Sequence, residues 1–176
     1  MPFGLVRFAV SWLIEMVVLF LVFTLMVVPS VLINPLSMVH DYPTDIYLKV
    51  VEMGLVKESQ NRKTPRFVVK RIIAIAVIGI LFGLVVKRFN GADSFLKGAA
   101  YTYILWSAAN CYDCLVIDCL WFCHSKRVVI PGTEGMKGYK DYMFHVKGSL
   151  KGMLLGLPAA LVAALSFSGC LQLKFV

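Results

Sequence analysis

The chain has 176 residues, of which 59% are hydrophobic, with a formal net charge of +8 and a mean hydropathy of +0.78. These values exclude an ordinary soluble domain and are typical of an integral membrane protein. At about 20 residues for each membrane-spanning helix, the length suffices for four spans and their loops, without a second domain. We therefore expect an all-α polytopic membrane protein, a bundle of four transmembrane helices forming one domain, residues 1–176.

Four long apolar stretches predict the spans. They cover approximately residues 8–33, 67–86, 95–123 and 151–173. The first is longer than the apolar core of about 7 to 15 residues in a secretory signal peptide, so we expect it to be retained as an anchor.

The first loop contains a predicted amphipathic helix, at about residues 45–59. Asp45, Lys49 and Glu52 recur there at helical spacing, opposite a set of apolar residues. Helices with this pattern lie on membrane surfaces, and that is the role we predict. Docking of a partner is the alternative.

The lysines and arginines predict the orientation in the membrane. Of the 18, five lie at the two ends and in the second loop, and thirteen lie in the first and third loops or at their borders. Cytoplasmic loops carry the excess of Lys and Arg, so we expect both termini outside and both long loops in the cytoplasm. Attraction to anionic lipid accounts for the net charge. The expected partner is therefore the lipid bilayer, with no nucleic acid.

Small residues mark the expected helix-packing faces. In the fourth span they recur every four residues, at Gly148, Gly152, Gly156, Ala160, Ala164 and Ser168. Gly79 and Gly83 form a shorter GxxxG pattern in the second span. In a bilayer such residues let helix backbones approach closely. Packing within the chain is the first expectation, and the same ridge would also serve the homo-oligomer that we expect.

The third span holds an unusual set of polar residues. Asp113 lies roughly 15 Å below Tyr103 at the helical rise of 1.5 Å per residue, and so near the bilayer midplane. On an α-helical wheel the polar residues share one broad face, which carries Asn110, Cys111, Asp113, Cys114, Asp118 and His124. The opposite side carries Cys119 and Cys123, for which the wheel predicts a packing role.

Two further carboxylates are predicted near the membrane surfaces. Asp118 lies close to Trp121, and Glu15 lies close to Trp12. We expect Asp118 to join an interfacial charge cluster with the basic residues that follow it, which are His124, Lys126 and Arg127.

A carboxylate deep in a membrane marks a functional site, which gives a first hypothesis of transport. In a small transport or channel protein, Asp113 would bind a proton, an ion or a small solute, Asn110 would orient it, and Cys114 lies beside them. Glu15 and Asp118 would stand at the two mouths. The chain carries no specific catalytic, nucleotide-binding or cofactor-binding motif, so we lean away from an enzyme and predict no cofactor.

A second hypothesis is thiol redox chemistry. The tetrapeptide Cys111-Tyr112-Asp113-Cys114 is a CxxC within a membrane helix. It resembles the redox pair of membrane enzymes of the vitamin K epoxide reductase and DsbB type, which implies a disulfide-exchanging pair, Cys111 and Cys114. Those enzymes relay electrons through cysteines in an outside loop, whereas the predicted outside loop here, residues 87–97, has none. Cys119, Cys123 and His124 supply at most three metal ligands, so we predict no metal site.

A third hypothesis assigns the work to the third loop, residues 124–150. Its segments WFCHSKRVVIPGTEG (121–135) and KDYMFH (140–145) resemble uncharacterised prokaryotic four-span membrane proteins. That resemblance implies a prokaryotic plasma membrane location and carries no activity. The loop would make the protein a non-catalytic membrane adaptor, in which changes at Glu134, Tyr142 or His145 abolish function. The Pro131-Gly132 pair predicts a tight turn in it.

Overall fold

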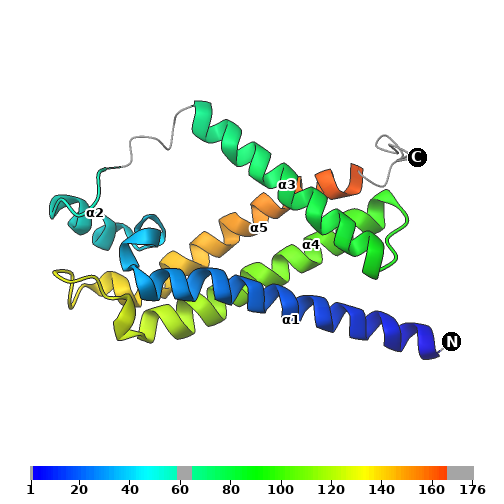
Figure 1. Ribbon diagram of the computed structural model, residues 1–176, viewed down its shortest axis with the longest axis horizontal. Helices are drawn as coiled ribbons and strands as arrows, with labels where there is room; N and C mark the ends of the chain where they lie inside the picture. Colours follow the sequence, from blue (N-terminus) through cyan, green and yellow to red (C-terminus); the bar gives the residue numbers. More distant parts are fainter. Residues whose placement is uncertain (1, 59–64, 166–176) are drawn as a thin grey trace. The chain divides into compact units, whose positions relative to one another are not determined.

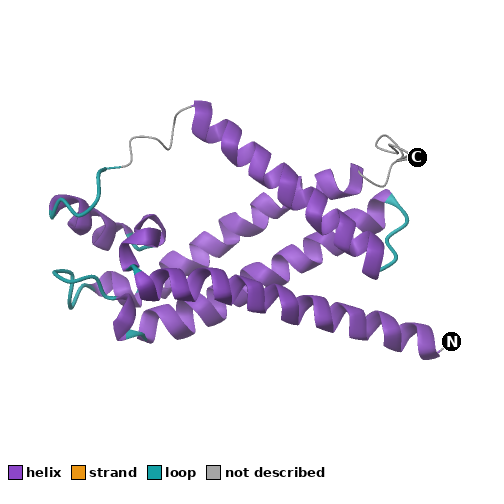
Figure 2. Ribbon diagram, in the orientation of Figure 1, coloured by secondary structure: helices purple, strands orange, loops and turns teal. Residues whose placement is uncertain are grey.

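The computed structural model describes residues 2–58 and 65–165 (Figure 1). Helices account for most of these residues and no strand occurs among them, which confirms the expected all-α class (Figure 2). In chain order the elements are α1 (Pro2–Ile33), η1 (Pro35–Asp41), α2 (Thr44–Glu52), α3 (Pro65–Phe89), α4 (Phe95–Tyr112), η3 (Asp113–Trp121), η4 (Phe122–His124), η5 (Lys126–Val128), η6 (Lys137–Lys140) and α5 (Tyr142–Leu165). The element η3 is a π-helix, and the other η elements are 3-10 helices.

Three helices of the described part are long and apolar enough to cross a membrane. They are Ala9–Ile33, Val68–Phe89 and Tyr142–Leu165, which correspond to the first, second and fourth predicted spans. This result is compatible with a membrane location. The last of them begins at Tyr142 and not at residue 151, and the predicted end of that span, residues 166–173, lies outside the described residues. The helix α4 is not among the three, since its 18 residues include polar side chains such as Lys97 and Asn110.

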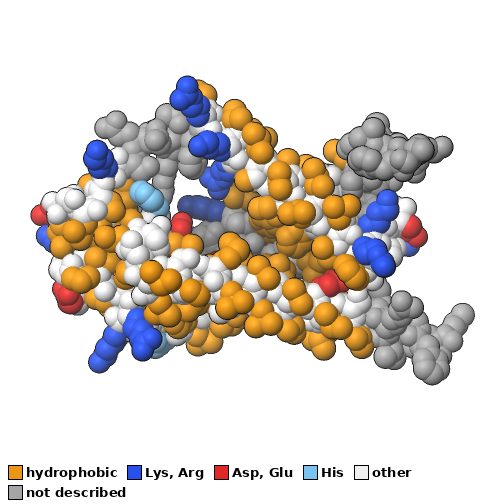
Figure 3. Space-filling model, in the orientation of Figure 1, with side chains coloured by type: hydrophobic (Ala, Val, Ile, Leu, Met, Phe, Trp, Pro, Cys, Tyr) orange, Lys and Arg blue, Asp and Glu red, His pale blue; other side chains and the backbone are white. Residues whose placement is uncertain are grey.

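Large apolar side chains lie exposed along these helices. On α1 the exposed fractions of Leu13, Leu25 and Ile33 are 64%, 70% and 85%. Figure 3 shows hydrophobic side chains along α1 and α3. Soluble proteins rarely leave contiguous apolar surface of this extent, whereas a lipid-facing helix needs it.

The chain divides into two compact units, and each is described by itself. Unit 1 comprises Met1–Val18, Asn61–Ala109 and Lys151–Val176. Unit 2 comprises Leu19–Gln60 and Asn110–Leu150.

In unit 1, small residues bring α3 and α5 together. A Cβ added to Gly79 of α3 would lie 2.6 Å from the carbonyl oxygen of Ala159 and 3.1 Å from Cβ of Val162, both on α5. Ala159 is fully buried, and so is Gly83, one helical turn after Gly79. The GxxxG pattern of the second span is therefore occupied by packing within the chain, as small residues allow in a bilayer.

The same helix α5 packs against α4 through Trp106. The indole Nε1 of Trp106 donates a hydrogen bond of 2.9 Å to the carbonyl oxygen of Gly152, and a Cβ on Gly156 would overlap the indole ring. Ala160 and Ala164 of the predicted ridge are also buried. These ridge residues pack inside unit 1, whereas Gly148 at the start of the ridge is exposed and has nothing within 4 Å of an added Cβ. Ser168 lies outside the described residues.

In unit 2, the loop segments fold into a compact core. Its fully buried members are Val39 of η1, Ile46 and Val50 of α2, Val128 of η5, and Ile130. The rings of Tyr42, Phe122 and Tyr139 pack among them. We call this core and the segments 34–56 and 122–141 around it the head.

The predicted helix 45–59 requires a correction. It ends at Glu52, after which Gly54 adopts a φ of 72° that ends the helix. Its apolar side chains Ile46 and Val50 are 0% exposed because they pack in the head core, so that face does not lie on the membrane. The predicted surface helix is instead a structural part of the head.

The third loop contains the predicted tight turn. The amide of Thr133 donates to the carbonyl oxygen of Ile130 at 3.0 Å, and Gly132 has a φ of 88°, which favours glycine at that position. Nearby, Asp45 at the start of α2 accepts a hydrogen bond of 3.1 Å from the amide of Gly138. A Cβ at position 138 would overlap the Asp45 carboxylate, so a larger residue there would displace that side chain. These contacts join the first and third loops.

Candidate functional site

The polar site is built on η3, whose geometry differs from the α-helix assumed from sequence. In a π-helix the backbone bonds run from residue i to i+5, so side chains five apart share one side. The burial pattern follows this spacing. Leu115 and Leu120 are 60% and 64% exposed, whereas Ile117 and Phe122, the residue that caps η3, are 3% and 6% exposed.

This spacing brings two carboxylates to one side of η3. Asp113 and Asp118 are five residues apart, and an α-helical wheel separates them by about 140°. In the π-helix they share a side, and their carboxylates interact electrostatically. The two predicted sites, the deep Asp113 and the interfacial Asp118, are therefore parts of one site.

His145 completes this site from the first turn of α5. Its Nδ1 lies 3.1 Å from Oδ2 of Asp118, and the His145 side chain is 5% exposed. The other ring nitrogen, Nε2, is buried and has no hydrogen-bond partner. The rings of Phe122 and Phe144 flank the imidazole, with centroids 5.2 Å and 5.4 Å away. We call Asp113, Asp118 and His145 the polar triad.

His145 was assigned from sequence to the surface of the third loop, and the structure corrects this. The signal that identifies it is its place inside α5, since a histidine within a membrane-length helix is itself a functional candidate. From the sequence, His145 was placed in the loop because the fourth span was predicted to begin at residue 151, whereas α5 begins at Tyr142.

The expected cluster of Asp118 with His124, Lys126 and Arg127 does not form. Among the described residues, the ion-pair partner of Asp118 is His145, and no ion pair joins it to Lys126 or Arg127. The Nδ1 of His124 instead lies 3.1 Å from the carbonyl oxygens of Cys119 and Leu120. Only an N–H can bond to a carbonyl oxygen, so Nδ1 carries the hydrogen. The hydroxyl of Tyr142 then donates to Nε2 of His124, at 3.3 Å.

The junction of α4 and η3 is tied to neighbouring helices within unit 2. The ring of Tyr112 stacks on Phe20 of α1, with centroids 4.3 Å apart. Thr24 donates a 2.8 Å hydrogen bond to the carbonyl oxygen of Phe20, so the 2.7 Å bond between the two hydroxyls is donated by Tyr112. On α5, Ser149 donates to the backbone carbonyl oxygen of Asn110 at 3.4 Å. These bonds hold the start of η3 just before Asp113.

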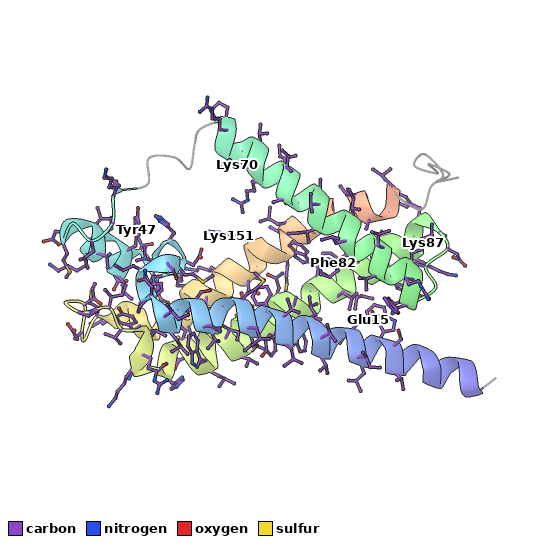
Figure 4. The ribbon with its side chains drawn as sticks, viewed as in Figure 1. Glu15, Tyr47, Lys70, Phe82, Lys87 and Lys151 are labelled. Atoms are coloured by element: carbon purple, nitrogen blue, oxygen red, sulfur yellow. The ribbon has the colours of Figure 1, made fainter. Side chains whose placement is uncertain are left out.

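Glu15, which was predicted at one mouth of the pathway, lies on α1 in unit 1 (Figure 4). Its Oε1 accepts a hydrogen bond of 3.0 Å from Ser11, one turn earlier on α1. Its Oε2 is buried without a partner. The structure therefore shows a partly buried carboxylate at this position, and its functional role stays a prediction.

The cysteines of the described part are free. Cys111 is exposed whereas Cys114 is buried. Cys114 and Cys119, five residues apart, share a side of η3 and interact, which corrects the wheel that placed them on opposite sides. Cys123 is buried in the head core. No group of three or more His, Cys, Asp or Glu side chains in 2–58 and 65–165 is arranged to hold a metal ion.

Comparison with protein-family models, with curated proteins and with solved structures gives no match for this chain. The resemblances noted in the sequence stay predictions for that reason, and the functional argument rests on the geometry of the site.

Proposed function

We propose that α4 and η3 together form a fourth membrane span. Together α4 and η3 form one continuous helical segment, residues 95–121, which is long enough to cross a hydrocarbon core about 30 Å thick. The exposed Leu115 and Leu120 of η3 are suited to contact lipid tails. Both termini would lie outside and the head would lie at the cytoplasmic surface of a prokaryotic plasma membrane, in accordance with the excess of Lys and Arg in the long loops.

We propose that this four-span protein is a small transporter or channel, and that the moving species binds at the polar triad. The observation that carries the proposal is the ion pair of the buried His145 with the partly exposed Asp118, with Asp113 five residues before Asp118 on the same side of η3. Ionisable side chains inside membrane helices are costly and are found where ions, protons or substrates bind. Asn110 and Cys114 lie beside Asp113 along α4 and η3.

The test is flux through the protein reconstituted in liposomes. Proton, sodium, potassium and small-solute fluxes are measured for the wild type and for Asp113→Asn, which removes the charge with little change of shape. Loss of one flux in this variant supports the proposal. Asp93→Asn is the matched control, since Asp93 is an exposed carboxylate whose side chain is 68% accessible. A flux that survives in Asp113→Asn, or that is absent from the wild type, contradicts the proposal.

A second candidate function is a membrane adaptor, which the folded head favours. The head has a core of its own and displays the exposed Glu134, and the exposed Tyr142 follows it directly at the start of α5. His145 no longer separates the two candidates, because it belongs to the polar triad. If the head is the working part, substitutions at Glu134 and Tyr142 abolish function while Asp113→Asn is tolerated; the transport proposal expects the reverse.

The redox alternative has its own test at Cys111 and Cys114. Their thiol state in native membranes is trapped by alkylation and read by mass spectrometry, beside a Cys111→Ser, Cys114→Ser double variant. A disulfide that cycles with a quinone or a reductant would support redox chemistry. Two reduced thiols and a fully active double variant would remove it.

A further inference from the structure

We propose that unit 1 holds a binding site for an alkali-metal cation, at the place where α1 meets the C-terminal end of α3. The ligands are oxygen atoms of four residues, which are Ser11, Glu15, Phe89 and Asn90. This inference goes beyond the proposed function, because it concerns unit 1 alone and needs neither the polar triad nor transport.

The hydroxyl of Ser11 brings three oxygen atoms together. Its Oγ lies 3.0 Å from Oε1 of Glu15 and 3.3 Å from the backbone carbonyl oxygen of Phe89. The hydroxyl has one hydrogen, whereas a carboxylate and a carbonyl group can only accept. One hydrogen therefore faces two acceptors, and the oxygen lone pairs of this cluster outnumber its donors. A cation stabilises a cluster of that composition.

Two side chains of this region have buried oxygen atoms without a hydrogen-bond partner. One is Oε2 of Glu15, whose Oε1 faces Ser11. The other is Oδ1 of Asn90, a side chain that is 6% exposed and whose Nδ2 also has no partner. Buried polar atoms in folded proteins nearly always have a partner, and an unpaired one points to a bound water or ion.

Asn90 lies at the same contact between α1 and α3. It directly follows Phe89 in the chain. Val86, one turn earlier, is fully buried in a small core, and Met16 of α1 packs against that core. Met16 directly follows Glu15, so both the carboxylate and the carboxamide lie at the border of this core. No hydrogen bond fixes the carboxamide, and a rotation can turn its oxygen to the cluster.

The charges around the cluster favour a cation. The C-terminal end of a helix carries partial negative charge on its unpaired carbonyl groups, which adds to the charge of Glu15. Among residues 2–58 and 65–165, no ion pair joins Glu15 to a lysine or arginine. Lys97 is paired with Asp93 at 2.9 Å, and Lys87 and Arg88 are exposed. The chain itself therefore supplies no counter-ion to this carboxylate.

The ligand set selects a monovalent metal ion. Hydroxyl, carboxylate, carbonyl and amide oxygens suit hard cations, and the cluster has neither the thiolate nor the imidazole that zinc prefers. One carboxylate neutralises one positive charge, so a divalent ion would keep a net charge. Sodium sites in membrane proteins use backbone carbonyl groups and the C-terminal ends of helices in this way. Ser11 and Glu15 are half-buried, which leaves a route for an ion to enter.

The experiment is thermal unfolding of the full chain in detergent, with sodium, potassium or N-methylglucamine chloride at one ionic strength. A ligand of the folded state raises its stability, and N-methylglucamine is too large for the site. We expect sodium or potassium to raise the unfolding midpoint of the wild type but not of Glu15→Gln, which can still accept the hydrogen bond from Ser11. Asp93→Asn is the matched control and should respond as the wild type does, because Asp93 is exposed.

Two results of this experiment would overturn the proposal. One is a wild-type midpoint that is the same in all three salts, in which case water satisfies the buried oxygens. The other is a rise in Glu15→Gln as large as that in the wild type.

Substitutions of Asn90 test the carboxamide by direct binding of sodium-22 or rubidium-86 to the purified protein. Leucine has a similar volume and no oxygen, whereas aspartate keeps an oxygen at the same place. We expect binding to be lost in Asn90→Leu and retained in Asn90→Asp. Unchanged binding in Asn90→Leu, or loss in Asn90→Asp, would contradict ligation by this side chain.

Ion flux measured on the same proteins in liposomes separates this inference from the proposed function. Cation binding that requires Glu15, in a protein without any flux, supports the site and contradicts transport. Flux that requires Asp113, in a protein whose cation binding does not require Glu15, supports transport and overturns the site. Both dependences together support both.

Discussion

Two buried threonines show how differently the two units are built. Thr133 in the head is 1% exposed, and its hydroxyl donates to the carbonyl oxygen of Ile130 at 2.7 Å and lies 2.6 Å from the hydroxyl of Tyr139. Thr102 on α4 of unit 1 is 0% exposed, and its hydroxyl has no hydrogen-bond partner. The head therefore pairs its buried polar groups as a soluble domain does.

The packing of the two units differs in the same way. The head encloses β-branched and aromatic side chains such as Ile46, Val50 and Phe122. Unit 1 brings helices together through glycine and alanine, as at Gly79 and Gly156, and leaves many of its large apolar side chains exposed. Hydrophobic burial thus stabilises the head, whereas close backbone packing stabilises the helices of unit 1, as expected in lipid. Four predictions test this contrast.

The largest effect is expected for Ile46→Ala in the head. Ile46 is 0% exposed in the head core, so truncation leaves a cavity and costs about 2–5 kcal/mol. Leu48→Ala on the same helix is the control, because Leu48 is 54% exposed and should cost little. Unfolding of the purified protein in detergent measures both. If Ile46→Ala and Leu48→Ala lose the same stability, the head does not have a core of the kind found in soluble domains.

A smaller loss is expected for Gly156→Ala in unit 1. The new methyl group would overlap the indole of Trp106 and cost about 1–3 kcal/mol. Gly148→Ala is the control on α5, since nothing lies within 4 Å of a Cβ there. That control should be neutral or slightly stabilising, because alanine favours the helix. If both variants unfold alike, close packing at Gly156 is not what joins α4 and α5.

The two threonines should respond to valine in opposite directions. Thr133→Val removes two hydrogen bonds at about 0.5–1.5 kcal/mol each, so the head is destabilised. Thr102→Val replaces an unpaired hydroxyl by a methyl group of the same shape and should be neutral or stabilising. Thermal unfolding of each variant beside the wild type measures the two changes in stability. Destabilisation by Thr102→Val would show that its hydroxyl has a partner.

The smallest effect is expected at alkaline pH for Tyr42. Its hydroxyl donates to the carbonyl oxygen of Val128 at 3.1 Å, and burial, with a smaller contribution from Tyr139, raises its pKa well above the usual value. A raised pKa in the folded state gives stability that is present below the unfolded pKa of about 10 and is lost above it. Tyr42→Phe should cost about 0.5–1.5 kcal/mol at neutral pH and weaken the alkaline loss. If Tyr42→Phe loses as much stability at alkaline pH as the wild type does, groups other than Tyr42 cause that loss.

The sequence predicted the helical class and three helices that are long and apolar enough to cross a membrane, because apolar length is a local property. It could not predict the π-helix, which no residue pattern marks and which alone puts Asp118 beside Asp113. The pairing of His145 with Asp118 was not predicted for a related reason, since the two residues lie on different elements. The burial of Ile46 and Val50 depends on the third loop, and the pattern of α2 is equally typical of a membrane-surface helix.

The most direct test of the polar triad is the flux of protons, sodium, potassium and small solutes across liposomes that contain the wild type, Asp113→Asn or Asp93→Asn. Each protein is first shown to have the same thermal stability. The account predicts that the wild type and Asp93→Asn carry one of these fluxes and that Asp113→Asn does not. Equal flux in Asp113→Asn and the wild type, or flux no faster than in empty liposomes for all three, would contradict it.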